Sequence, residues 1–186
     1  MRSKISGILG IESSTVSHTE RLVSALGSFQ VILLVFYTGH IFLVPTGTLL
    51  IVPSMVASAV LLFAVPHGAL SQPWSLLGGH VVSALVGVTC TRLVPEALVA
   101  APLAVGLAVG CMYYLRCIHP PGGATALVAV VGGADVHALG YAFANFECFN
   151  LPVFLAQDLH GCSPLFIGHT HFGVCRYQGF PSFKVI

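Results

Sequence analysis

The residues of this chain that are best suited to chemistry lie together in segment 116–126, which reads Arg-Cys-Ile-His-Pro-Pro-Gly-Gly-Ala-Thr-Ala. Two prolines remove backbone donors and two glycines permit crowded backbone, so the chain must leave helical geometry here. If a short helix follows over 123–131, its first amides point from a positive helix end into the space beside the histidine and the arginine. That arrangement would attract a small anion. The predicted substrate path consists of Arg116, His119, Pro120, Pro121, Gly122, Gly123, Ala124 and Thr125.

Two placements of this segment are consistent with its sequence. Irregular backbone at membrane depth is tolerated only where protein buries it or water reaches it, so one placement is a re-entrant segment that lines a cavity. The other is a simple cytoplasmic turn. Arg116 would then serve equally well as an anchor at the membrane surface. His119 could couple proton movement to anion movement, although a hydrogen-bonded structural histidine is at least as common.

Three further polar residues are candidates for a vestibule of the same path. His67 and Gln72 belong to a turn-rich loop, 66–74, which lies on the same side as His119 if the N-terminus is cytoplasmic. His80 is near the start of a predicted span, where an interfacial position is the simpler interpretation, although ionisable groups at membrane depth are usually functional. A shared entrance requires the loop to fold inward.

The sequence carries none of the common patterns of an enzyme site. It has no paired carboxylates, nucleophile elbow, phosphate loop or H-E-x-x-H motif. The C-terminal part is rich in metal-ligating residue types, but their spacing matches no common zinc finger. We therefore predict a protein that is not an enzyme and that uses no metal or cofactor. The residues weighed as zinc ligands and set aside are Cys148, His160, Cys162, His169, His171 and Cys175.

The elements that must position these residues are predicted to be membrane-spanning helices. Only 7% of the residues are charged, and no Asp, Glu, Lys or Arg occurs from residue 22 to residue 91. An average soluble domain has about a quarter of its residues charged. A hydrocarbon core about 30 Å thick needs roughly 20 apolar residues per helix. We predict an all-α transmembrane bundle with a short re-entrant or fifth helical segment and four spans, at 22–44, 48–65, 76–94 and 98–115.

Small residues at four-residue spacing predict close helix packing on two spans. In membranes such residues let backbones approach one another. With few helices per chain, we also expect a homo-oligomer. The predicted packing residues are Gly79, Ser83 and Gly87 on the third span and Gly106 and Gly110 on the fourth.

The charges predict an orientation and exclude one class of partner. A formal net charge of +1 offers no basic field for nucleic acid. With a cytoplasmic N-terminus, four basic residues lie inside and one, Arg92, lies outside, which satisfies the positive-inside rule. The expected partners are therefore the lipid bilayer and a small inorganic anion. The four inside residues are Arg2, Lys4, Arg21 and Arg116.

The motif His119-Pro120-Pro121, followed by Gly-Gly-Ala-Thr-Ala, resembles the signature of the HPP family of integral membrane proteins. Segments 58–64, 71–73, 77–80 and 83–87 are similar to that family's second and third helices. Some members are implicated in nitrite transport, so the resemblance implies a small-anion transporter or channel with nitrite as the leading substrate. A non-transporting scaffold that packs through its glycine faces is the alternative.

The resemblance divides the chain into three parts. Residues 1–21 form a polar N-terminal tail, and 22–143 form the HPP-type transmembrane region. After Phe143 the family continues into another apolar helix, whereas this chain reads Asn-Phe-Glu-Cys-Phe-Asn over 145–150. We interpret 144–186 as a divergent tail that arises from an altered reading frame or splice.

Overall fold

The computed structural model describes residues 17–43, 53–66, 68–148 and 150, and every regular element in these ranges is helical. Residues 142–148 form a further helical stretch after the last named helix. The elements are α2 His18–Leu43, α3 Pro53–Ala64, the 3₁₀ helix η2 Ala69–Ser71, α4 Pro73–Leu93, α5 Ala97–Leu115, α6 Pro120–Val131 and α7 Gly133–Leu139.

Local capping explains where several helices begin. Ser17 and Glu20 form a reciprocal capping box: the Ser17 amide donates to Glu20 Oε2 at 2.6 Å and the Glu20 amide donates to Ser17 Oγ at 3.2 Å. This box starts α2 at His18, four residues before the predicted start. Proline occupies the first residue of α4 and of α6, where its missing N–H leaves no helical bond unmade.

The prediction of an all-α membrane bundle is confirmed. Three helical stretches are long and apolar enough to cross a membrane: His18–His40, Pro73–Leu93 and Ala97–Leu115. A fourth crossing is available if α6 and α7, bent by 101° at Gly132, count as one broken span. That bend agrees with the predicted short segment after the fourth span.

The second predicted span, 48–65, differs from the structure in its length. Its described part is α3, whose 12 residues extend over about 18 Å, less than a hydrocarbon core about 30 Å thick. Residues 44–52 lie outside the described ranges. Within the described ranges, α3 is a short apolar helix that reaches part of the way across.

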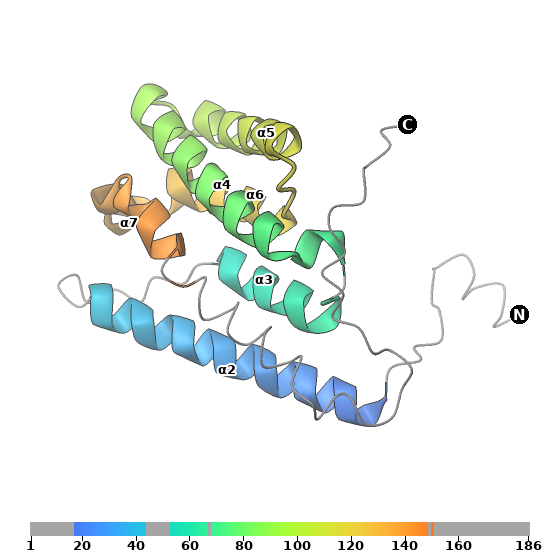
Figure 1. Cartoon of the computed structure of the whole chain (residues 1–186). Helices are drawn as coiled ribbons and strands as arrows, with labels where there is room; N and C mark the ends of the chain where they lie inside the picture. Colours follow the sequence, from blue (N-terminus) through green and yellow to red (C-terminus); the bar gives the residue numbers. More distant parts are fainter. Residues whose placement is uncertain (1–16, 44–52, 67, 149, 151–186) are drawn as a thin grey trace, which may run out of the picture.

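Helix α4 is the centre of the bundle. In Figure 1, α6 passes behind α4, α5 lies above them and α3 below, with the long α2 beyond α3. Half of the α4 span is buried, against 17% of the α2 span and 22% of the α5 span. One apolar cluster joins α2, α3 and Leu76, and a second joins α4, α5 and α6. Any polar group carried inward by α4 is therefore enclosed on several sides.

Helices α4 and α6 approach each other through glycine. A Cβ added to Gly87 would lie 2.6 Å from Ala129 Cβ and 2.7 Å from the Ala126 carbonyl oxygen. One added to Gly122 would lie 2.7 Å from the Gly79 carbonyl oxygen and 2.9 Å from Ser83 Oγ. Real Cβ atoms essentially never come so close. The third-span residues predicted to pack, Gly79, Ser83 and Gly87, all lie at this contact.

The glycines predicted to pack on the fourth span make no close helix contact within the described chain. A Cβ added to Gly106 or Gly110 would meet no atom within 4 Å among the described residues. The side of α5 that packs inward is instead an alanine row, with Ala100, Ala104 and Ala108 fully buried. The two glycines lie off that row and leave their surroundings open.

We predict that Gly87→Ala destabilises the protein by about 1–3 kcal/mol, because the added methyl group must push α6 away from α4. Thermal unfolding of the purified protein in detergent, followed by helical circular dichroism, would measure the difference. Gly106→Ala is the matched control, since its methyl group meets open space. Equal unfolding temperatures for the two variants would contradict the close approach.

Candidate functional site

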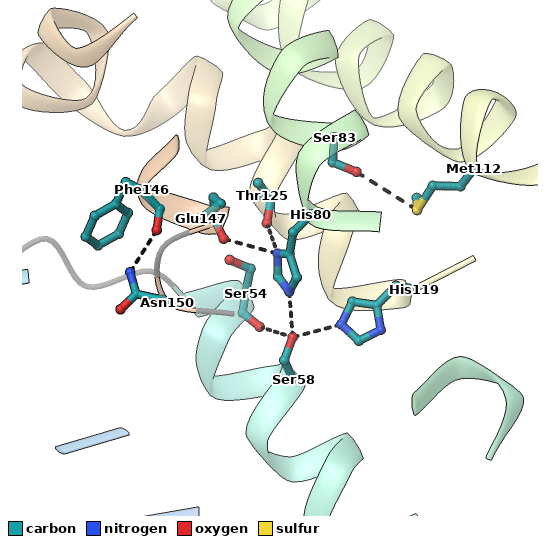
Figure 2. Close-up of polar contacts among 10 residues, drawn as sticks. All are labelled: Ser54, Ser58, His80, Ser83, Met112, His119, Thr125, Phe146, Glu147 and Asn150. Atoms are coloured by element: carbon teal, nitrogen blue, oxygen red, sulfur yellow. Dashed lines mark hydrogen bonds and ion pairs between the residues drawn. The ribbon is translucent and has the colours of Figure 1, made fainter. Parts of the chain in front are cut away.

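Two histidines far apart in the sequence meet at one serine in the centre of the bundle. Ser58 Oγ, from α3, lies 2.8 Å from His80 Nε2 and 2.8 Å from His119 Nε2. The two imidazole rings are 5.0 Å apart between centroids. Figure 2 shows Ser58 between the rings, with Thr125 and Glu147 on the far side of His80. All five side chains have zero exposure. We call these five residues the His–Ser cluster.

The position of His119 is fixed by contacts on both sides of the loop that carries it. It is the residue before α6, where its extended backbone turns the chain into the proline pair. Trp74 Nε1 donates to the Leu115 carbonyl oxygen at 3.1 Å and ties the end of α5 to the start of α4. Gly79 then leaves the space against α4 that the His119 side chain fills. The loop after α5 is thus pulled inward rather than left as a surface turn.

The hydrogen-bond partner of His119 Nδ1 determines which ring nitrogen carries the hydrogen. His119 Nδ1 lies 2.8 Å from the Leu70 carbonyl oxygen, and a carbonyl oxygen only accepts, so Nδ1 carries the hydrogen. In neutral His119 the other nitrogen, Nε2, is an acceptor and must receive the Ser58 hydroxyl hydrogen. Ser58 can then accept from His80, which places a hydrogen on His80 Nε2.

His80 is the link between Ser58 and the acidic end of the cluster. Its Nδ1 lies 2.9 Å from Thr125 Oγ1 and 3.2 Å from Glu147 Oε2. The contact with Glu147 has ion-pair distance without hydrogen-bond geometry, since neither carboxylate oxygen has a hydrogen-bond partner among the described residues. At 1.5 Å per residue, His80 lies about 10 Å along α4 from Pro73, and its side chain is fully buried between the helices.

The predicted helix-end anion site is not built as expected. Helix α6 begins at Pro120 rather than at residue 123, so the amides of Ala124 and Thr125 fall inside the helix. Pro120 and Pro121 have no N–H to offer, and the Gly122 amide donates to the His119 carbonyl oxygen at 2.8 Å. The prolines thus remove half of the amides that a helix end normally presents. Side chains, rather than backbone amides, are the polar groups facing this space.

The remaining predicted site residues are dispersed. Arg116 is exposed at the end of α5, in a left-handed conformation with φ 56°, and its side chain is not part of the cluster. Gln72 is exposed, and its Nε2 donates to the Gly68 carbonyl oxygen at 3.1 Å. Gly123 and Ala124 are half-buried, beside the buried Pro121, Gly122 and Thr125. His67 lies outside the described residues.

Sequence reasoning missed two members of the cluster. Ser58 stands in an apolar run where a single hydroxyl carries no signal by itself. Glu147 was assigned to the divergent tail, yet an isolated acid next to Phe146, in a chain with so few charges, was a usable signal. The residues from His160 to Cys175 that were weighed as zinc ligands and set aside lie outside the described residues.

Comparison with known proteins places this chain among membrane proteins. The family model described as HPP, transmembrane region, matches residues 13–156, which extends past Phe143. A transmembrane protein of Dictyostelium discoideum is 42% identical over 112 residues, covering 58% of this chain and 36% of the relative. A second transmembrane protein of that organism is 43% identical over 86 residues, covering 44% and 30%. The chain thus spans about a third of these relatives. No solved structure matches.

We predict that Ser58→Ala destabilises the protein by about 1–3 kcal/mol, because it leaves buried nitrogens of two histidines without their partner. Unfolding in detergent at neutral pH would measure this cost. Ser54→Ala is a matched control one helical turn away: Ser54 Oγ is buried with no hydrogen-bond partner among the described residues, so its removal should be neutral or stabilising. An equal cost at both positions would contradict the assigned bonds.

Proposed function

Because this chain belongs to the HPP transmembrane family, we propose that it carries a small inorganic anion across its membrane, with nitrite as the leading substrate. The observation that supports this proposal is the fully buried His–Ser cluster. Ionisable side chains within a membrane are costly, and they usually mark a path for an ion or a proton. In a scaffold, the same groups would serve only as hydrogen bonds between the helices.

The cluster has the chemistry to hold a small anion in place of water. A protonated histidine offers an N–H at each ring nitrogen, and Ser58 and Thr125 add hydroxyl donors. Ser58 Oγ contacts Nε2 of both histidines, so the two imidazole rings meet at this hydroxyl group. Since all these groups are buried, a transport cycle requires the helices to move and open the cluster to each side in turn. Arg116, exposed at the end of α5, is positioned to attract anions to the surface rather than to bind them in the centre.

Several finer features belong to the same proposal. The N-terminus faces the cytoplasm, following the distribution of Lys and Arg. The protein has no enzymatic activity, and its partners are lipid, the anion and further copies of itself. The open glycine face of α5 at Gly106 and Gly110 favours the alternative function, a scaffold that binds partner helices. A scaffold predicts stable co-purifying membrane proteins and no ion flux.

We predict that the purified protein in liposomes moves nitrite faster than protein-free liposomes do, and that His119→Ala reduces the flux to the protein-free level. The physical reason is the loss of the ring that joins Ser58 to the Leu70 carbonyl group. Stopped-flow nitrite entry, at matched protein incorporation, is the measurement.

His40→Ala is the matched control, because His40 is exposed on α2 and is not a member of the cluster. Its flux should equal that of the unmodified protein. Equal flux in His119→Ala and His40→Ala would remove the cluster from the mechanism. No flux in the unmodified protein, with partner proteins that co-purify, would favour the scaffold.

A further inference from the structure

Glu147 is an acid that the proposed anion path does not explain. Its side chain has zero exposure, and neither carboxylate oxygen has a hydrogen-bond partner among the described residues. A lone carboxylate without hydrogen bonds is very unfavourable inside a bundle surrounded by hydrocarbon. Its one charged-group contact is His80 Nδ1 at 3.2 Å. The two side chains must therefore share a proton, either as carboxylic acid and neutral imidazole or as carboxylate and imidazolium.

The contacts continue from Glu147 to the loop after α3 without a gap. They run from Glu147 Oε2 to His80 Nδ1 at 3.2 Å, and from His80 Nε2 to Ser58 Oγ at 2.8 Å. They then run from Ser58 Oγ to His119 Nε2 at 2.8 Å. His119 Nδ1 keeps its hydrogen and donates it to the Leu70 carbonyl oxygen throughout. His80 and Ser58 can each accept a proton on one side and release one on the other, and His119 Nε2 accepts at the end, so the row has the connectivity of a proton relay.

Ser58 has an arrangement for each protonation state of His119. In neutral His119, Nε2 accepts the Ser58 hydroxyl hydrogen. When His119 carries a second proton, Nε2 becomes a donor, and the Ser58 hydroxyl hydrogen can turn to the Ser54 carbonyl oxygen, 2.9 Å away. All three partners already lie within hydrogen-bond distance. A proton can therefore arrive at His119 without movement of any heavy atom.

We propose that the ion coupled to anion transport is a proton, bound by Glu147 and relayed through His80 and Ser58 to His119. This proposal rests on the proposed transport of an anion. In the transfer, the Glu147 O–H breaks and His80 Nδ1–H forms. The Ser58 hydroxyl hydrogen passes to His119 Nε2, which breaks the old Ser58 O–H bond and forms His119 Nε2–H. The hydrogen of His80 Nε2 moves to Ser58 Oγ and forms the new O–H bond. The products are a Glu147 carboxylate and a His119 imidazolium, which binds the anion.

Charge balance sets the stoichiometry at one proton per anion. The empty cluster is neutral, with one proton shared by Glu147 and His80. An anion that enters alone would leave a net negative charge in a low-dielectric interior, at high cost. If a proton from water reprotonates Glu147 as the anion binds His119, the loaded cluster is neutral again. The cluster is then neutral both when it is empty and when it holds the anion. In either state the protein can change between its two open conformations without a net buried charge.

The other charged groups of the neighbouring elements do not enter this balance. Arg92 is exposed at the far end of α4, where it lies over the Tyr141 ring at 4.6 Å. On α7, Asp135 is half-buried, and His137 is exposed with its Nε2 near the Val130 carbonyl oxygen. The described parts of α2, α3 and α6 that pack nearby carry hydroxyl groups and His40, which is exposed, but no acid or base that faces Glu147.

The test is Glu147→Gln, which keeps the size of the side chain and removes the titrating proton. Liposomes would hold an entrapped pH-sensitive dye, and protein-free liposomes would correct for nitrous acid that crosses lipid unaided. In the unmodified protein, external nitrite should acidify the interior as it enters. In Glu147→Gln, at matched protein incorporation, acidification and gradient-driven accumulation should fall to the protein-free level, because His119 no longer receives the proton with which it binds the anion.

Glu96→Gln is the matched control, since Glu96 is exposed at the start of α5, and it should behave as the unmodified protein does. Acidification in Glu147→Gln equal to that control would overturn the relay. Nitrite entry in the unmodified protein without acidification would also overturn it, and would leave the proposed transport function standing.

A second measurement does not depend on transport. Infrared difference spectra of the purified protein between two pH values should contain the carbonyl band of a protonated carboxylic acid, and Glu147→Gln should lack it. Ser58→Ala should retain the band, because that change interrupts the relay beyond Glu147. If nitrite flux is absent altogether, the proposed function fails, and this band still decides whether Glu147 binds a proton. The same spectrum in the unmodified protein and in Glu147→Gln would refute that role.

Discussion

The close approach of α4 and α6 is the constraint on which the centre of this protein depends. Gly79, Gly87 and Gly122 leave no room for a side chain between the two helices. Because of this contact, the loop that carries His119 is held against α4, and the ring reaches the serine that already bonds His80. A wider spacing would move the two imidazoles apart and break the contact of one of them with Ser58. The helix packing and the polar cluster are therefore one feature.

The proline pair changes how this protein can attract an anion. A helix end usually does so with free backbone amides and with its dipole. Here Pro120 and Pro121 supply no amides, and Gly122 is already bonded. In the proposed transport, the positive charge would then come from an imidazole that gains a proton. Such a charge can be switched on and off, whereas the charge of a helix end is permanent.

The sequence was sufficient for the bundle and for three of the five residues of the cluster. Charge depletion and the length of the apolar runs predicted the spans, and the His-Pro-Pro motif pointed to His119 and Thr125. The burial of His80 was not predictable, because it depends on which face of α4 meets α6. Glu147 was missed because its partner lies far away in the sequence, and pairing between distant residues leaves no local pattern. The capping box at Ser17 was readable, and it would have placed the start of α2 correctly.

The position of Glu147 also has a consequence for biogenesis. A ribosome adds about 5–20 residues per second, so His80 is synthesised several seconds before Glu147. Ser58 is synthesised earlier still, and it is the cluster partner that His80 has during that interval. The stretch 142–148 is too short to insert by its own hydrophobicity, and its acid opposes insertion. Docking of this stretch onto the earlier helices would complete the His–Ser cluster, and quality control could recognise chains in which that step has failed.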